Sequence, residues 1–592
     1  MGEPSFGSTP SGGPSEKRLD SWKEIAAYLN RDVTTVQRWE KREGMPVHRH
    51  LHDTRGSVYA LPSELHAWAE RRRSCREDKP AGGVEAAEAP SEQTKSRTPQ
   101  ARRWLALAGM IALGLAVIAY LAWQGHVGRA APAGIKSLVV LPLKNLSGDP
   151  AQEYLADGMT EALIGRLSTI NGLRVISRTS AMQLKNTPKT APEIGKELNV
   201  DSIVEGSVIR DGNRIRVHAQ LIRAASDEHL WSATYDRELR DVLVLQSEVS
   251  QAIAGKVEVA VTGKEQARLT ATRAVSPEVY ESFLKGRFAL DKGDSRTDID
   301  ESIGYFEEAI QKDATFAPAY VGLAEAHVQR STVFIGAPPE EERAKGIAAA
   351  RKALELDPDS AEAHVLLAEM LRLQWQWAEA EGEFKQALQL NPNDAAAHDG
   401  FASWLLSQGD TDEALTWARR GRDLDPLAIS GSGIGWILFQ AHQYDEAINE
   451  FRSVAAVRPE DAGNLWLLGF ALTANGQPAE AIPVLEKALP ISNRSPGIIG
   501  VLVRAYAHAG RRADALRLLE ELKRRKQAGY VPAAAFVNAY LGLGENEEAF
   551  VWLEQAYKEH SNILLYLKTH PYFDPIRDDP RFGNLLRRVG LS

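Results

Sequence analysis

The hydrophobic and polar positions of this 592-residue chain change pattern several times from the N-terminus to the C-terminus. Residues 19–73 mix helical and strand periods, residues 104–123 are apolar without a charge, and residues 136–262 alternate strand-like runs with helical stretches. From residue 277 onward, apolar positions recur with helical spacing almost to the end. We therefore expect a multidomain protein, because a chain of this length is too long for one core.

Two polar segments separate these patterns. Residues 1–18 are rich in Gly, Pro and Ser and predict a disordered lead, and residues 77–103 have the composition of a flexible linker. The linker ends at the apolar run 104–123, which has Trp104 and Trp123 at its ends. This length spans the hydrocarbon core of a bilayer at the helical rise, and tryptophan favours the headgroup level. The run predicts one transmembrane helix, with a buried core helix as the alternative.

Charges beside the apolar run predict its orientation. Lys and Arg are frequent just before it, whereas the nearest cations after it are Arg129 and Lys136. Because cytoplasmic flanks carry the excess of Lys and Arg, the N-terminal side should be cytoplasmic. Ala108, Ala112 and Ala116 share one helical face, which would let two such helices approach in a homodimer. Chance placement in an Ala-rich run is the alternative.

A helix-turn-helix pattern lies within residues 19–73. Ser21 to Glu24 fits a capping box for a helix over about 22–29, and a turn at 30–32 leads to a second helix that ends at Gly44. The outer face of this helix should be polar and basic, so it could reach phosphates and base edges in a major groove. The residues expected on this face are Thr34, Thr35, Gln37, Arg38, Lys41 and Arg42.

The stretch after the second helix predicts a hairpin with residues 53–56 at its tip, then a third helix capped by Ser63. Residues 21–44 and the run DTRGSVYA resemble the MerR and excisionase type of winged helix, a small α+β fold. The resemblance implies that the second helix enters the major groove and that Arg49 and Arg55 contact the DNA backbone. The alternative is a helical hairpin that contacts protein, its basic residues solvating one face.

His48, His50 and His52 alternate, so a strand would place them on one face, as metal ligands can be placed. A closed zinc site needs a fourth ligand, and Cys75 is the only cysteine of the chain. We expect phosphate or water at these histidines and no metal. The single cysteine also excludes an internal disulfide.

Residues 136–262 predict elements in the order β, α, β, α, β, β, β, α, which indicates an α/β sandwich with a mixed sheet. Two helices are expected at about 152–167 and 241–261, and residues 211–213 form a hairpin signal. Residues 141–168, with LRVISRTS, VDSIVEGSV and HLWSATYDRE, resemble the TolB-like domain, which implies a sensory or interaction role without known catalysis. The carboxylates expected at turns, caps and exposed positions are Asp149, Asp157, Glu161, Glu205 and Asp236.

The helical pattern from residue 277 onward is a sequence repeat. Alanines of a Glu-Ala or Asp-Ala pair recur 33 or 34 residues apart, at Ala380, Ala414, Ala447, Ala481, Ala515 and Ala549. Prolines follow the second helix of each unit, and first helices carry large-then-small pairs such as Ile434 and Gly435. The 34-residue period resembles the tetratricopeptide repeat, and it predicts an all-α solenoid of about eight repeats over residues 277–570. Residues 571–592 depart from the repeat and should cap the last hairpin.

A stacked array of such hairpins has a concave groove that usually holds a peptide or a protein surface. The predicted partner-binding anchors in that groove are Trp375, Trp377, Trp404 and Trp436, with membership of the core as the alternative.

Composition and motifs argue against an enzyme. The formal net charge of −9 is small for the length and indicates no particular class of binding partner. The sequence has no GxxxxGK[ST] loop, no HExxH, no kinase DFG set and no GxSxG elbow. We therefore expect no catalytic residues and no cofactor.

Together the resemblances imply a membrane-anchored one-component transcription regulator, similar in layout to ToxR-type regulators. It would cross the bacterial inner membrane once, with promoter DNA bound in the cytoplasm and the TolB-like and repeat domains sensing a protein or an envelope state in the periplasm. The alternative is a cell-envelope scaffold that binds proteins but no DNA. A cyclase-type enzyme is a third possibility, which lacks a catalytic domain here.

Overall fold

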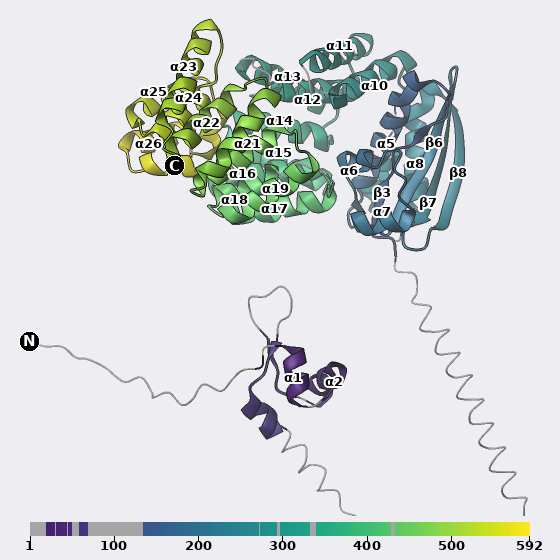
Figure 1. Cartoon of the computed structure of the whole chain (residues 1–592). Helices are drawn as coiled ribbons and strands as arrows, with labels where there is room; N and C mark the ends of the chain where they lie inside the picture. The colour runs from purple at the N-terminus through teal and green to yellow at the C-terminus, as the bar shows by residue number, and fades with distance from the viewer. Residues whose placement is uncertain are drawn as a thin grey trace, which may run out of the picture. The chain divides into compact units, whose positions relative to one another are not determined.

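The computed structural model describes residues 19–68 except 20, 30, 44 and 50–57, and residues 134–591 except 258, 272, 293–295, 332–338 and 428–431. These residues belong to two compact units, 1–125 and 126–592 (Figure 1). The predicted lead, linker and apolar run lie outside the described residues. Within the described ranges, every helix is too short or too polar to cross a membrane.

The described part of the first unit contains two helices, a two-stranded sheet and a third helical segment, as the sequence predicts. Its elements are α1 (Trp22–Tyr28), α2 (Val33–Glu43), β1 (His48–Arg49), antiparallel β2 (Val58–Tyr59) and a helical segment over 62–68.

The core of this unit is small. Ile25, Val36 and Leu65 are fully buried, one from each helical segment, and the Ser21 hydroxyl accepts the Glu24 N–H at 3.2 Å to cap α1. The third helix starts at residue 62, so Ser63 lies inside its first turn and is not its N-cap, a shift of the size common at helix ends. The hairpin tip lies outside the described residues.

The second unit begins with an α/β layer that contains the predicted elements in their predicted sequence and, in addition, the short strand β4 and the helix α6. Its strands are β3 (Ser137–Val140), β4 (Lys144–Asn145), β5 (Arg174–Val175), β6 (Ser202–Asp211), β7 (Arg214–Arg223) and β8 (Glu228–Glu238). Its helices are α5 (Glu153–Ser168), α6 (Arg178–Gln183), α7 (Ala191–Leu198) and α8 (Val242–Ala254), with short 3₁₀ turns η1 (Pro150–Gln152) and η2 (Leu239–Asp241).

The sheet is mixed, with strand order β5-β3-β6-β7-β8 and β4 beside β6. β3 runs parallel to β5 and β6, whereas β6, β7 and β8 form antiparallel pairs. Gly212, at a φ of 59°, makes the tight turn between β6 and β7, as the hairpin signal predicts. Alternate side chains of β7, from Ile215 to Leu221, are fully buried, so one sheet face packs against α5 and α8.

After the connecting helix α9 (Gly263–Thr270), the described residues form sixteen helices in eight consecutive pairs. They are α10 (Pro277–Lys292), α11 (Arg296–Lys312), α12 (Ala317–Arg330), α13 (Pro339–Leu356), α14 (Ala361–Leu373), α15 (Trp377–Leu390), α16 (Ala395–Gln408), α17 (Thr411–Leu424), α18 (Ser432–Gln440), α19 (Tyr444–Val457), α20 (Ala462–Ala474), α21 (Pro478–Ile491), α22 (Pro496–His508), α23 (Arg512–Ala528), α24 (Ala533–Leu543) and α25 (Asn546–Lys558). The chain ends with η3 (Asn562–Tyr566), η4 (Pro571–Ile576) and α26 (Pro580–Val589).

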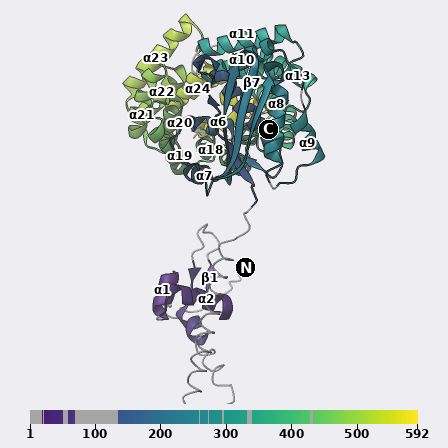
Figure 2. The ribbon, with the colours of Figure 1, turned by 90° about the vertical axis from the view of Figure 1, so that its right-hand side faces the viewer.

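The sequence pattern predicts the sheet domain and the helical array as two separate units, and the structure corrects this. α10 packs against α5, and residues 126–592 form one compact unit. Figures 1 and 2 both place the sheet beside this end of the array.

Small residues set the spacing of the helices, as the repeat pattern predicts. The six periodic alanines from Ala380 to Ala549 are all 0% exposed. A Cβ built on Gly435 would lie 2.7 Å from the Phe451 ring, and one on Gly469 would lie 2.4 Å from Leu485. A large side chain of one helix therefore fills the place that a side chain would occupy on its partner.

Gly435→Leu tests this spacing. We expect it to lower the free energy of unfolding by about 1–3 kcal/mol, because the added side chain overpacks the α18–α19 contact. Gly382→Leu is the matched control, since a Cβ at Gly382 of α15 meets no atom within 4 Å. Urea unfolding of the full chain in a mild detergent measures both, and equal stability of the two variants would contradict the explanation.

Candidate functional site

The start of α2 is organised around Asp32. Its Oδ1 accepts the Thr35 N–H at 2.8 Å and the Thr34 hydroxyl, and its Oδ2 accepts the Thr35 hydroxyl at 2.7 Å. The side-chain hydrogen bonds from Thr34 and Thr35 hold the pKa of Asp32 well below its usual range. Both threonines, predicted to bind DNA, thus donate their hydroxyls to the helix cap.

Farther along α2, the predicted DNA-binding side chains differ in exposure. Gln37 is half-buried, whereas Arg38 and Lys41 are exposed, and residues three apart share a helical face. The side chains of Arg42 and Arg49 and the whole of Arg55 lie outside the described part of the chain. Arg38 and Lys41 are therefore the cations that the described first unit presents on its second helix.

His48 is engaged inside the first unit. Its ring stacks on Tyr59 with 5.0 Å between centroids, and its Nε2 lies 2.7 Å from Glu64 Oε2. His50 and His52 lie outside the described residues. Across the residues that are described, no group of three or more His, Cys, Asp or Glu side chains is arranged to hold a metal.

The four predicted groove tryptophans contact other parts of the chain. Trp375 stacks on His560 at 4.4 Å, Trp377 Nε1 donates to the Val589 carbonyl at 2.8 Å, and Trp404 Nε1 donates to the Trp377 carbonyl at 2.9 Å. Trp436 lines a cavity described below. Trp436 also packs against Phe439 and Tyr566, so all four residues make contacts within the chain. Partner binding by them stays a prediction.

The C-terminal residues do more than cap the last hairpin, which corrects the prediction for residues 571–592. Salt bridges of Arg581 and Arg588 with α25 do cap it, at 2.8 and 2.7 Å. Residues 562–591, here called the returning segment, also reach earlier repeats. Thr569 Oγ1 donates to Gln440 at 3.2 Å, and the Tyr572 hydroxyl donates to the Phe470 carbonyl at 3.1 Å. The C-terminal residues pack against the array because several of their aromatic side chains are buried.

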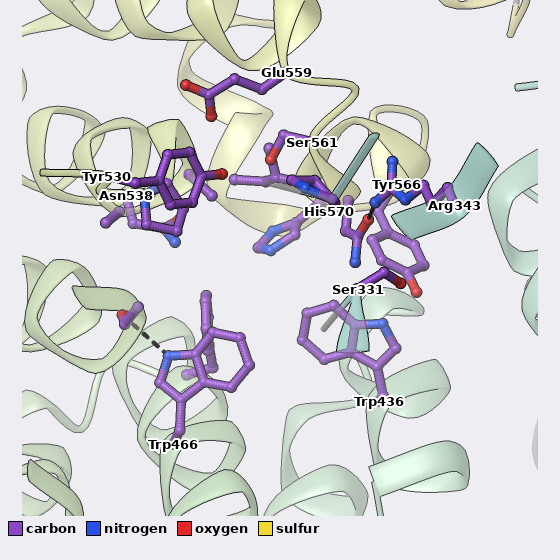
Figure 3. Close-up of a pocket in the computed structure, with 18 residues that line it drawn as sticks. Ser331, Arg343, Trp436, Trp466, Tyr530, Asn538, Glu559, Ser561, Tyr566 and His570 are labelled. Atoms are coloured by element: carbon purple, nitrogen blue, oxygen red, sulfur yellow. Dashed lines mark hydrogen bonds between the residues drawn. The ribbon is translucent and has the colours of Figure 1, made fainter. Parts of the chain in front are cut away.

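A cavity of about 130 Å³ remains between the array and this returning segment. Figure 3 shows Trp436 and Trp466 on one side of it and Tyr530, His570 and Tyr566 on the other. Only Trp436 is among the residues singled out from the sequence. The others are widely separated along the chain, and no local motif marks them.

His570 is a deeply buried titratable group of this cavity wall. It is 2% exposed, and its Nδ1 accepts the Tyr572 N–H at 3.2 Å, which leaves the ring proton on Nε2. Burial, helped by nearby cations such as Arg504, lowers the pKa of His570 well below its ordinary value. The folded protein therefore holds this ring neutral.

The lowered pKa predicts a loss of stability in acid. Below about pH 6.5 the unfolded chain protonates His570 and the folded chain does not, so stability falls as the pH drops through that value. Between pH 7.5 and 5.5 the free energy of unfolding should fall by about 1.4 kcal/mol more than in His570→Asn. The variant keeps an acceptor for Tyr572. Urea unfolding at both pH values gives the comparison, and equal losses would contradict it.

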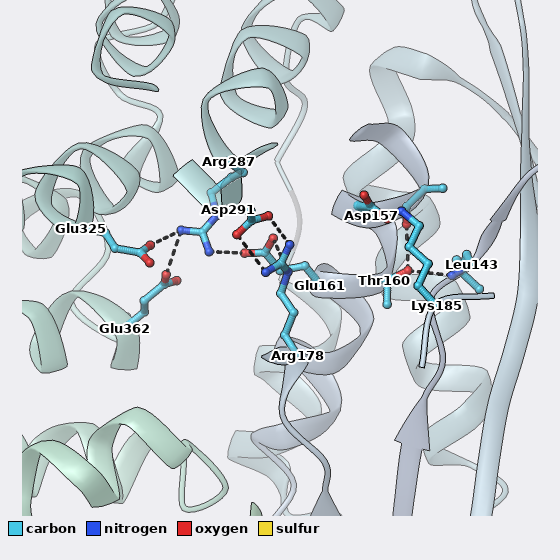
Figure 4. Close-up of polar contacts among 11 residues, drawn as sticks. Leu143, Asp157, Thr160, Glu161, Arg178, Lys185, Arg287, Asp291, Glu325 and Glu362 are labelled. Carbon is cyan, nitrogen blue, oxygen red and sulfur yellow. Dashed lines mark hydrogen bonds and ion pairs between the residues drawn. The ribbon is translucent and has the colours of Figure 1, made fainter. Parts of the chain in front are cut away.

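An ion-pair cluster joins the sheet domain to the repeats (Figure 4). Arg287 of α10 lies 2.7 Å from Glu161 of α5, contacts Glu325 of α12, and lies 3.5 Å from Glu362 of α14. Arg178, at the start of α6, lies 3.2 Å from Glu161. Burial alone would lower the pKa of Arg287, but the surrounding carboxylates raise it well above its ordinary value.

The predicted exposed positions of two carboxylates, Asp157 and Glu161, are wrong. Asp157 is 6% exposed and lies 2.6 Å from Lys185, and Glu161 is the acid shared by two arginines, so neither is an exposed helix residue. Asp149 does cap η1, accepting the Ala151 N–H at 2.9 Å, as predicted. These contacts give the acids structural partners.

The ends of α15 and α17 form a second contact with the sheet domain. The Ser177 N–H donates to the Leu424 carbonyl at 2.9 Å, and Asn393 Nδ2 donates to the Ser168 carbonyl at 2.8 Å. The array thus touches the sheet domain through its first repeats and again through its middle repeats.

Comparisons with known families match both parts of the second unit. Residues 135–252 match the model of the HilA/YgeH-like transcriptional regulator, second domain. Residues 361–394, 433–496 and 472–535 match models of the tetratricopeptide repeat, which confirms the repeat prediction. The resemblance of the sheet domain to the TolB-like family stays a prediction, as does the likeness of the first unit to the MerR type.

Two curated relatives match part of the chain. A protein named putative adenylate cyclase 3, from Rhizobium meliloti (strain 1021), is 34% identical over 243 residues, 40% of each chain. The peroxisomal targeting signal receptor of Komagataella phaffii is 26% identical over 185 residues, 30% of each chain. The chain thus spans less than half the length of these relatives.

Solved tetratricopeptide proteins give partial matches. One from Thermus thermophilus has a TM-score of 0.29 and 15% identity, covering 33% of this chain and 98% of its own. One from Parabacteroides merdae has a TM-score of 0.31 and 13% identity, covering 53% of this chain and 100% of its own.

Proposed function

We propose that this chain is a membrane-bound transcription regulator whose repeats receive a protein signal. The observation that carries the proposal is the match of residues 135–252 to a transcriptional regulator domain, in one chain with a helix-turn-helix that exposes Arg38 and Lys41. Exposed cations on the second helix of such a motif suit contact with phosphates and base edges.

The membrane part of the proposal rests on residues 104–123, whose length and lack of charge suit one span. The cations before this run favour a cytoplasmic N-terminus at a bacterial inner membrane, with residues 126–592 on the periplasmic side. A single span passes on a signal most simply through pairing of two chains, so we propose a homodimer at the DNA, where winged helices often occupy two half-sites.

The repeats are proposed to bind a protein or peptide. Tetratricopeptide arrays present extended concave surfaces for such partners. The relative from Komagataella phaffii is named a targeting signal receptor, and this name supports protein or peptide binding by the matching residues of this chain. The name of the putative cyclase supports no activity here, because the match covers 40% of that protein. An envelope scaffold that binds no DNA is the second candidate, favoured by the internal engagement of Thr34 and Thr35.

Arg38→Ala separates these two candidates. We expect discrete promoter peaks in chromatin immunoprecipitation with the unaltered chain and their loss with the variant, because one exposed cation of the major-groove helix is removed. Lys487→Ala, which removes an exposed cation of α21, should leave the peaks unchanged. An absence of enriched promoters for the unaltered chain would reject the regulator in favour of the scaffold.

Reporter fusions test the proposed topology. Alkaline phosphatase fused after residue 270 should be active, and the same enzyme fused after residue 90 should be inactive, because it folds only outside the cytoplasm. Deleting residues 104–123 should abolish activity at 270. Activity at 90 would reverse the orientation, and inactivity at both positions would remove the periplasmic placement.

A further inference from the structure

The cavity between the array and the C-terminal segment has apolar walls and a size that suits one small ring. Its volume of about 130 Å³ compares with the roughly 150 Å³ of an engineered apolar cavity that binds benzene. The indole rings of Trp436 and Trp466 line one side, and the ring of Phe470 is also part of the lining. An aromatic or compact aliphatic body would therefore fill it.

Arg343 brings a positive charge to the lining of this cavity. It is 1% exposed, and its guanidinium donates to the His560 carbonyl at 2.8 Å and to Asn562 Oδ1 at 2.6 Å. Within the described ranges it makes no ion pair, and its Nε has no hydrogen-bond partner. Burial lowers the pKa of Arg343 to about 10, so the side chain is still charged at neutral pH. A buried cation without a counterion is costly.

Neutral donors without acceptors lie around the same space. The Nε2–H of His570 and the indole N–H of Trp436 have no acceptor among the residues that the structure describes, and both side chains line the cavity. Asn538, 3% exposed, also has a buried atom without a partner, but that atom is the acceptor Oδ1. The two N–H groups of His570 and Trp436 would suit an incoming acceptor.

Glu559 also lines the cavity, and its carboxylate accepts hydrogen bonds from the chain itself. One oxygen accepts the Ala533 N–H at 3.1 Å and the other accepts Gln555 Nε2 at 2.8 Å. Aromatic rings beside a carboxylate would suit a cation, yet the charge of Arg343 in the same wall would repel one. The free donors and the unpaired guanidinium favour an anion.

We propose that this cavity binds a carboxylate carried on an apolar body of about the size of a benzene ring. The carboxylate satisfies the donors and the charge of Arg343, and the rings enclose the apolar part. The ligand is a free carboxylic acid or the C-terminal residue of a peptide, which share this chemistry. Binding in the cavity requires neither DNA nor a membrane, so it goes beyond the proposed function and does not depend on it.

Benzoate is the probe for this site. Titrated into the full chain in mild detergent and followed by tryptophan fluorescence and calorimetry, it should bind at least about tenfold more tightly than neutral benzamide, since a hydrogen-bonded charge adds that much. Benzyltrimethylammonium should not bind. Equal binding of benzamide, tighter binding of the ammonium compound, or no benzoate binding at millimolar concentration would overturn the proposal.

Two variants locate the binding. Arg343→Met should weaken benzoate at least about tenfold and leave benzamide unchanged. Because Arg343 also holds the C-terminal segment, Ala534→Leu provides a second test: it fills the cavity from its wall and removes no polar contact, so benzoate binding should be lost. Ala378→Leu, at an exposed position of α15, is the matched control. Unchanged benzoate binding by Ala534→Leu would overturn the site.

Peptides distinguish the two sources of the carboxylate. A hexapeptide ending in phenylalanine with a free C-terminus should bind more tightly than benzoate if chain ends are the ligand, and its C-terminal amide should lose that binding. Weaker binding of the free-acid peptide than of benzoate identifies a free acid. Equal binding of the peptide acid and its amide would overturn the carboxylate as the recognised group. Promoter binding in cells is read independently, so either proposal can fail alone.

Discussion

The second unit depends on one buried guanidinium. Arg287 is the meeting point of α5 in the sheet domain with α12 and α14 in the array, because each contributes a carboxylate to it. Its side chain is only 11% exposed, so its desolvation has to be offset by those acids together. Arg178 shares Glu161 and ties α6 into the same cluster. The sheet domain and the first repeats are therefore held together as one body by these ion pairs.

The returning C-terminal segment imposes the second constraint. A solenoid of this period would ordinarily leave its inner surface free for a partner. Here Thr569 and Tyr572 bond to helices more than a hundred residues earlier, so part of that surface is already filled by the chain itself. The space left at Trp436 and Trp466 is small and enclosed on two sides. A large partner must bind elsewhere on the array or displace the segment.

Periodic features could be predicted from the sequence, and long-range ones could not. The alanines from Ala380 to Ala549 mark the repeats because every hairpin needs a small residue at the same place. Ser21 and Gly212 likewise act through neighbours within a few residues. In contrast, Trp377 meets Val589 and Arg287 meets Glu161 across distances in sequence that no period spans. For that reason the sequence predicts neither the cavity nor the ion-pair cluster, and it places Asp157 wrongly on an exposed face.

The origin of the cavity walls determines what a ligand can do. Trp436 and Trp466 come from α18 and α20, whereas Tyr566 and His570 come from the returning segment, so all four face a ligand only while the segment is packed down. A ligand shifts an equilibrium only through its different affinity for the two states. A carboxylate bound here would therefore favour the closed segment and oppose any partner that needs it displaced.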